Sequence, residues 1–130
     1  MNQITSPTSA GFPVTVYHNS RCSNSRGALA LIREHGIEPQ IVDYIAQPLD
    51  AAALTALVAQ LGVPVRDLLR SKEAVYAELQ LAREALSDAE LIAAVAAHPV
   101  LLNRPIVVTP RGAALCRPPE KVLALLPAAA

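Results

Sequence analysis

Two kinds of hydrophobic periodicity alternate along this chain. Apolar, β-branched runs predict strands at about 14–17 and 40–44, and apolar residues at helical spacing predict a helix at about 23–35 between them. A strand, a helix and a second strand in this order form a right-handed unit whose strands are parallel. The chain is therefore expected to open with a βαβ unit.

The middle of the chain is predicted to be almost wholly helical. Asp50 is expected to cap a strongly periodic helix, and shorter helices are expected at about 65–69 and 74–81. The sequence Ser-Asp-Ala-Glu that begins at Ser87 is a capping box, which predicts a further helix that ends before Pro99. These helices separate the opening unit from the strands that follow.

Two closely spaced strands and a helix are expected at the C-terminal end. The run 103–109 is β-branched and predicts a buried strand, 110–112 predicts a turn, and 113–116 predicts the hairpin partner. Pro119 suits the first turn of a last amphipathic helix. Because proline lacks an N–H, Pro105 belongs at the start of its strand. We expect the Arg104–Pro105 bond to be cis. The element order predicts an α/β fold.

Composition is typical of a globular protein with a sizeable core. Hydrophobic residues make up 52% of the 130 residues, and the mean hydropathy is +0.33. We predict a single domain over 13–130, preceded by a disordered N-terminal segment over 1–12. The longest apolar runs, such as 91–97, are far too short to cross a membrane.

Charge and cysteine content narrow the functional classes. The 11 basic and 11 acidic residues balance, and the basic C-terminal region is poor in aromatic residues. This argues against a nucleic-acid surface and suits a small anion site better. The first residues lack a basic, apolar export signal. With two cysteines, free thiols in a reducing cytoplasm are expected.

Cys22 lies where the first strand gives way to the helical pattern. A helix N-terminus favours a thiolate, and Arg21 and Arg26 add positive charge nearby, as does His18 when it is protonated. A thiolate in such an anion site is a nucleophile, although a lone cysteine is often only a small buried residue, which is the alternative interpretation. Position 25 is serine, so the motif is C-x-x-S and has no adjacent resolving cysteine. An external thiol would have to complete any reduction.

Four segments of the chain form a set of motifs in a fixed order. They are HNSRCSNSR at 18–26, LLRSKE at 68–73, NRPIVVTP at 103–110 and LCRP at 115–118. Together they resemble the glutathione- and glutaredoxin-coupled arsenate reductases, the ArsC-like proteins, over about 14–126. The resemblance implies a thioredoxin-like fold, with a small mixed four-stranded sheet (βαβ then ββα) and a helical insertion. It also implies a cis proline after Arg104.

The resemblance further implies the roles of six residues. Cys22 would be the catalytic nucleophile, and His18 and Ser25 would help to activate it. The substrate oxyanion would be bound by three arginines: Arg70, Arg104 and Arg117. Arginine is a permanently charged planar fork that binds oxyanion oxygens in pairs, which suits tetrahedral arsenate.

The implied reaction is reduction of arsenate to arsenite, with glutathione as co-substrate and glutaredoxin as protein partner. No bound cofactor is expected, and no metal, because the spacing of His18, Cys22 and Cys116 matches no usual zinc pattern. Two positions depart from the family, since Ser20 replaces its usual proline and Asn24 its threonine or lysine. We expect a less rigid loop before the thiol and an anion site that survives.

Other interpretations stay open at this point. The same scaffold could serve a thiol-dependent reductase or transferase of another substrate, or a non-enzymatic thioredoxin-like redox regulator that binds RNA polymerase. Regulators of that kind typically use a C-x-x-C pair, which this chain lacks. Cys116 is expected to pack inward if Arg117 faces the site, because neighbouring residues of a strand face opposite ways.

Overall fold

The computed structural model describes residues 12–127, which form two compact units. One unit, the sheet unit, comprises 12–43 together with 104–127, and the other, the helical unit, is Tyr44–Asn103. The expected N-terminal segment 1–12 lies outside the described residues except for Phe12. A single domain over 13–130 stays a prediction.

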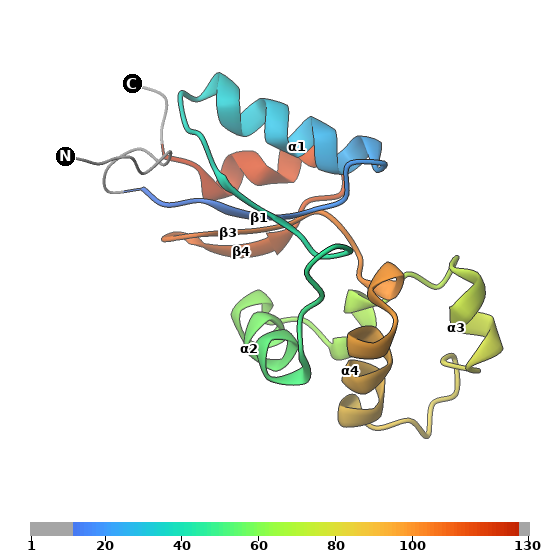
Figure 1. Ribbon diagram of the computed structural model, residues 1–130. Coiled ribbons are helices and arrows are strands. Elements are labelled where there is room, and N and C mark those ends of the chain that lie inside the picture. The colour runs from blue at the N-terminus through green and yellow to red at the C-terminus, as the bar shows by residue number, and fades with distance from the viewer. Residues whose placement is uncertain (1–11, 128–130) are drawn as a thin grey trace. The chain divides into compact units, whose positions relative to one another are not determined.

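A four-stranded mixed sheet forms the sheet unit, in the order β2-β1-β3-β4 (Figure 1). β1 (Thr15–His18) is parallel to β2 (Gln40–Asp43), and α1 (Ser23–Glu34) connects them. β3 (Ile106–Thr109) is antiparallel to both β1 and β4 (Gly112–Leu115). The βαβ opening, the later hairpin and the mixed four-stranded sheet are thus confirmed.

α1 and the C-terminal 3₁₀ helix η3 (Pro119–Leu125) lie side by side on one face of this sheet (Figure 1). They approach closely at Gly27, where an added Cβ would meet Pro119 Cγ at 2.9 Å. Side chains from the sheet and both helices form one core, in which Val16 and Ile32 are fully buried. This packing holds α1 against the strand that precedes it, and so fixes where the first turn of α1 lies.

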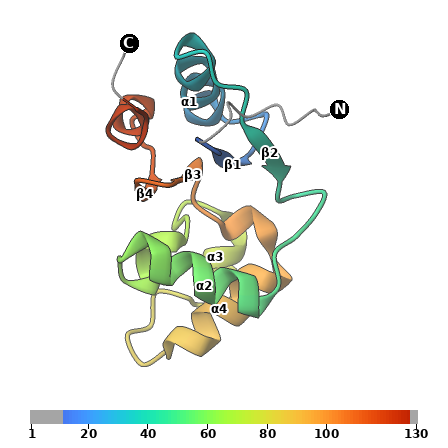
Figure 2. The same ribbon diagram turned by 90° about the vertical axis from the view of Figure 1, so that its left-hand side faces the viewer.

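The helical unit consists of three α-helices and two 3₁₀ helices within residues 44–103 (Figure 2). They are α2 (Ala51–Leu61), η1 (Val65–Leu68), α3 (Ala74–Glu78), α4 (Asp88–Ala97) and η2 (Pro99–Leu101). α2 packs on α4, and α4 packs on both 3₁₀ helices around buried leucines. No helix among the described residues has both the length and the apolar surface needed to span a membrane. The predicted helical block between the two halves of the sheet is confirmed.

Local sequence signals set the ends of these helices. Asp50 Oδ1 accepts a hydrogen bond from the Ala53 N–H at 2.8 Å, and Gly62 ends α2 with a φ of +66°. Ser87 and Glu90 form the reciprocal capping box that opens α4. At the N-termini a side chain accepts a backbone N–H that has no partner within the helix. At the C-terminus of α2 a glycine adopts the left-handed conformation that ends the helix.

Two predicted helices need correction. The helix expected at 74–81 covers only Ala74–Glu78, and Gln80 then takes a φ of 55°, which a continuing helix does not allow. The last helix is 3₁₀ rather than α. Its buried residues Val122 and Leu125 are three positions apart, which is the repeat of a 3₁₀ helix.

Candidate functional site

Cys22 occupies the N-cap position of α1, at the end of the loop that follows β1. Its backbone is extended, with φ −94° and ψ 124°, and its N–H donates to the Asn19 carbonyl at 2.9 Å. Asn19 also accepts the Arg21 N–H on Oδ1 at 3.0 Å, which forms an Asx turn. The loop therefore presents the thiol at the first turn of the helix, where backbone N–H groups have no partner within the helix.

Ser25 is the polar centre of this first turn and is fully buried. Its Oγ accepts from the Asn19 N–H at 3.3 Å, and both its N–H and its hydroxyl hydrogen-bond to the sulfur of Cys22. One side chain thereby ties the loop before the thiol to the helix after it. The structure brings Ser25 to the thiol, and its part in catalysis stays a prediction.

These contacts make Cys22 an acidic thiol. Partial burial by itself raises the pKa of Cys22, but hydrogen bonds from the N–H and hydroxyl of Ser25, the side chain of Arg104 and the N–H of Asn24 outweigh it. The pKa falls from an ordinary value of 9.0 to about 7. This shift makes the thiolate, which is the form that attacks an electrophile, a well-populated state at neutral pH.

The strand topology brings Arg104 and Arg117 to the edge of the sheet where the thiol loop begins. Arg104 lies just before β3 and Arg117 just after β4, and the antiparallel register pairs Ile106 with Leu115 at this end. Tyr17, near the end of β1, is the other strand partner of Ile106. The thiol loop and the two arginines therefore leave the sheet at one edge.

Arg117 makes direct contacts at this edge. Its Nη1 donates to the Arg104 carbonyl at 2.9 Å and lies 3.8 Å from Cys22 Sγ. The Arg104 side chain hydrogen-bonds to the same sulfur. The Arg104–Pro105 bond is cis, which confirms the prediction, and Arg117–Pro118 is an additional cis bond. Two guanidinium groups from separate strands thus face one sulfur, an arrangement suited to binding an oxyanion there.

Asn24 stands out in the sequence only as a departure from the family, and its contact with Arg117 is not predicted there. Its amide oxygen faces Arg117 and accepts from Nη1 and Nη2 at 3.3 Å each, an orientation assigned from the hydrogen-bonding partners. Its own N–H hydrogen-bonds to the Cys22 sulfur. The sequence shows only a polar residue two positions after the cysteine. No local pattern ties such a residue to an arginine in a distant segment.

His18 ends β1 and has only 9% of its surface exposed. Its Nδ1 is buried without a hydrogen-bond partner within residues 12–127. Burial lowers the pKa of His18; Asp43, its partner across the parallel strands, opposes this, and Arg26 and Arg33 lower it further. The imidazole is therefore neutral at neutral pH. The structure places His18 at the start of the thiol loop, and its part in catalysis stays a prediction.

Arg70 belongs to the helical unit and lies in the segment between η1 and α3. Its Nε donates to Glu73 at 3.1 Å, and its backbone N–H donates to the Leu101 carbonyl at 2.7 Å. That Arg70 joins the other two arginines around an anion stays a prediction.

Cys116 is fully buried in the core of the sheet unit. The hairpin partner expected over 113–116 covers Gly112–Leu115, so Cys116 lies one residue beyond β4. Burial raises the pKa of Cys116 to about 12, with Lys121 acting in the opposite direction. Cys116 therefore packs inward while its neighbour Arg117 reaches the site. Over the described part of the chain, no group of three or more His, Cys, Asp or Glu could hold a metal ion.

Comparison with known proteins supports a family assignment for this site. The sequence profile of the ArsC family matches residues 17–125, which include the thiol loop and both arginines. The chain belongs to the ArsC family. An arsenate reductase of Rhizobium meliloti strain 1021 is 49% identical over 114 residues, which cover 88% of this ArsC-family chain and 81% of that protein. An Escherichia coli arsenate reductase is 47% identical over the same shares of the two chains.

A solved structure agrees with the architecture of this ArsC-family chain. The arsenate reductase from Vibrio cholerae is 46% identical in sequence, and it superposes with a TM-score of 0.86 over 88% of this chain and 98% of that one. The thioredoxin-like fold that the four motifs imply is therefore confirmed.

Proposed function

We propose that this ArsC-family chain reduces arsenate to arsenite, with Cys22 as the nucleophile. The observation that carries the proposal is an ionisable Cys22 sulfur with the side chains of Arg104 and Arg117 against it. The relatives from Rhizobium meliloti, Escherichia coli and Vibrio cholerae are arsenate reductases by name. A dianionic tetrahedral oxyanion suits two guanidinium groups at a helix N-terminus.

The first step joins sulfur to arsenic. The arginines neutralise charge on the arsenate oxygens, which would otherwise repel the thiolate. The Cys22 thiolate attacks arsenic, an S–As bond forms, and one arsenic oxygen takes up protons and leaves as water. The product is a thiol-bound arsenate ester in which arsenic is still pentavalent.

The second step needs two electrons from an external thiol, because Ser25 stands where a resolving cysteine would be and Cys116 is buried. The sulfur of glutathione attacks Cys22 Sγ, the S–As bond breaks, and its electron pair reduces arsenic to the trivalent state. Arsenite leaves, and a mixed disulfide joins Cys22 to glutathione. A glutaredoxin thiolate then attacks the glutathione sulfur and frees Cys22.

Three further residues have supporting roles in this proposal. Ser25 holds the thiol loop and stabilises the thiolate, His18 orients the loop or relays a proton, and Arg70 supplies the third contact to the anion. Glutathione acts as a co-substrate, and the reaction uses no bound cofactor. We assign the reaction to the cytoplasm, where thiols stay reduced.

An arsenite-release assay with the full chain, followed through the first and later turnovers, tests this function. Arsenate, glutathione and glutaredoxin are supplied together, each is omitted in turn, and arsenite is measured. We expect arsenite only when arsenate and glutathione are both present, and repeated turnover only when glutaredoxin is added. Equal turnover with thioredoxin as the donor would overturn the choice of reductant. No arsenite under any condition would overturn the activity itself.

A further inference from the structure

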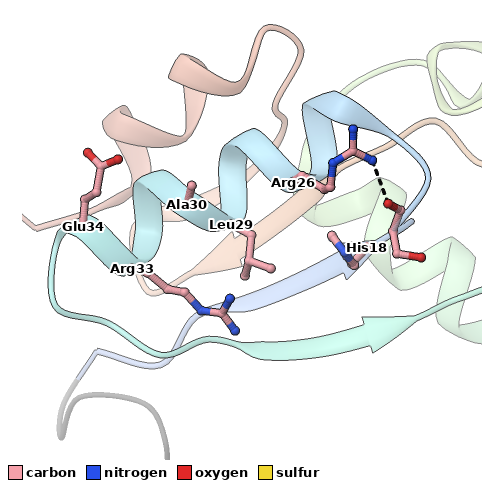
Figure 3. A pocket seen from close by; sticks show the side chains of 7 residues that line it. His18, Arg26, Leu29, Ala30, Arg33 and Glu34 are labelled. Atoms are coloured by element: carbon pink, nitrogen blue, oxygen red, sulfur yellow. Dashed lines mark hydrogen bonds between the residues drawn. The ribbon is translucent and has the colours of Figure 1, made fainter.

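A groove of about 690 Å³ runs along α1 in the sheet unit (Figure 3). Its lining includes two residues from the end of β1 and the loop after it, and four from successive turns of the helix: His18, Ser20, Arg26, Leu29, Arg33 and Glu34. Figure 3 shows Leu29 and Arg33 extending from α1 toward the strands, with His18 below the first turn. The groove thus combines apolar surface with charged side chains.

Arg26 is an exposed cation in the lining of the groove. Its Nη1 donates to the Ser20 carbonyl at 2.8 Å, the contact drawn in Figure 3, and it forms no ion pair within residues 12–127. Arg33, two turns further along, is instead paired with Glu38 through Nε and Nη2 at 2.9 and 2.7 Å. An exposed guanidinium beside a groove is suited to a carboxylate ligand.

The imidazole of His18 adds a polar side chain to the wall of the groove. His18 lines the groove, is nine-tenths buried, and its Nδ1 has no hydrogen-bond partner in the described part of the chain. A buried polar atom without a partner is costly, so such atoms are usually satisfied by protein, water or ligand. Nδ1 itself is closed off from solvent, so a ligand in the groove would meet the rest of the ring.

The groove reaches the loop that carries the reactive thiol, although Cys22 itself does not line it. Ser20 precedes Cys22 by two residues, and Arg26 follows it by one helical turn, about 6 Å along the axis. Leu29 lies between Arg26 and Arg33 on the same helix face, because the spacing is i, i+3 and i+7. A ligand with a thiol directed toward Cys22 and a carboxylate on Arg26 fits this order, and an apolar part of the same ligand would continue along Leu29.

We propose that the groove binds glutathione, with one carboxylate on Arg26 and the cysteine sulfur directed toward Cys22. Glutathione is a tripeptide with two carboxylates, one ammonium group and a central thiol, and its thiol lies within roughly 10 Å of each carboxylate. This inference rests on the proposed function, because it names the site of the thiol co-substrate. The groove supplies binding and orientation and leaves the covalent steps unchanged.

Arg26→Gln tests the groove, because it removes the charge and keeps much of the side-chain length. Single-turnover rates are measured with glutathione and with 2-mercaptoethanol, which has no charge. We expect the KM for glutathione to rise about 10-fold, and the rate with 2-mercaptoethanol and the KM for arsenate to change less than about twofold. Arg26→Lys keeps the charge and should restore most of the glutathione affinity. Lys121→Gln, at an exposed position of the same unit, is the matched charge control and should change neither.

Three outcomes of this experiment would overturn the proposal. The first is an unchanged KM for glutathione in Arg26→Gln. The second is equal slowing with both thiols, which would mean that Arg26 only holds the loop through Ser20. The third is a defect confined to regeneration by glutaredoxin, which would assign the groove to docking of that protein.

Binding of a glutathione analogue is measured separately from turnover. The two measurements distinguish an error in the proposed groove from an error in the proposed function. S-methylglutathione is titrated into ¹⁵N-labelled Cys22→Ser, and we expect shifts of the amide signals of Arg26 and Leu29. Adding Arg26→Gln should remove these shifts. No shifts in a protein whose wild type still turns over with glutathione would overturn the groove alone. Shifts without any turnover of arsenate would overturn the proposed function alone.

Discussion

Cys22 and Cys116 belong to the same sheet unit, and their surroundings differ in exposure and in hydrogen bonding. Cys22 is partly exposed at the N-cap of α1 and is approached by backbone N–H groups, a hydroxyl and two guanidinium groups. Cys116 is fully buried, and its Sγ lies 3.7 Å from the Ala114 carbonyl. The pKa is about 7 for Cys22 and about 12 for Cys116.

The comparison separates burial from the groups that accompany it. Burial opposes ionisation of both thiols, and only at Cys22 do donors to the sulfur outweigh it. At Cys116 the nearby carbonyl is an acceptor, which favours the protonated thiol. Being next to an arginine in the sequence is not enough, because Arg117 directly follows Cys116 and yet contacts Cys22. The backbone direction decides which sulfur the cation reaches.

Replacing each cysteine in turn should give the largest contrast. Cys22→Ser should abolish arsenate reduction, because a serine hydroxyl is not ionised at neutral pH and cannot be regenerated by thiol exchange. Cys116→Ala should retain at least about half of the activity, since it removes one buried atom away from the chemistry. The measurement is the amount of arsenite formed per molecule of enzyme in each variant. Activity retained in Cys22→Ser would end the assignment of the nucleophile.

Alkylation should distinguish the two thiols over a wide pH range. Iodoacetamide reacts with the thiolate, so the rate at Cys22 should rise with pH through a midpoint of about 7 and level off above it. At pH 7 the thiolate fractions of the two cysteines should differ by a factor on the order of 10⁴ or more. Mass spectrometry of the folded protein follows each site. Comparable alkylation rates at both cysteines would contradict the difference in pKa between Cys22 and Cys116.

Arg117→Lys should impair turnover although it keeps the charge. A lysine ammonium cannot replace a planar fork that contacts Asn24, the Arg104 carbonyl and the Cys22 sulfur together. We expect kcat/KM for arsenate to fall about 30-fold, which corresponds to about 2 kcal/mol of lost contacts.

Arg111→Lys is the matched control for this change. Arg111 is exposed in the β3–β4 turn of the same unit, where its Nη1 donates to the Leu126 carbonyl. Its kcat/KM should stay within about twofold of the wild type. If lysine works as well as arginine at position 117, that residue acts only as a distant charge.

Backbone order explains what could be predicted of this site. The junction of a strand and a helix places Cys22 at a helix N-terminus, which depends only on element order. The choice of Arg104 and Arg117 comes from the resemblance to the ArsC-like proteins, and the hairpin register explains why the two lie at one edge. Asn24 and its contact with Arg117 depend on a side-chain pairing across distant segments, which periodicity does not encode.

Tertiary context explains what the sequence left undecided. The cis and trans isomers of an X–Pro bond differ little in free energy in a short peptide. The folded surroundings therefore select the cis isomer at Arg117–Pro118. The 3₁₀ form of the last helix likewise follows from packing Val122 and Leu125 on the sheet, and an amphipathic pattern alone does not show it.

Ser25→Ala should make Cys22 more like an ordinary thiol. It removes the hydroxyl that hydrogen-bonds to the sulfur and the acceptor of the Asn19 N–H. The midpoint of the alkylation rate should move upward by about one pH unit, with about a 10-fold loss of reactivity at pH 6. Ser23→Ala, at the exposed first position of α1, is the matched control and should leave the midpoint in place. An unchanged midpoint in Ser25→Ala would limit that residue to packing.

Asn24→Ala should have the smallest effect, and it separates the two things that Asn24 does. The substitution keeps the backbone N–H that donates to the Cys22 sulfur, so the midpoint of alkylation should not move. It removes the amide oxygen that holds both terminal nitrogens of Arg117, so the KM for arsenate should rise about threefold. A shifted midpoint with an unchanged KM would contradict this division. The side chain would then act on the sulfur, and the Arg104 carbonyl and the Cys22 sulfur would suffice to hold Arg117 in place.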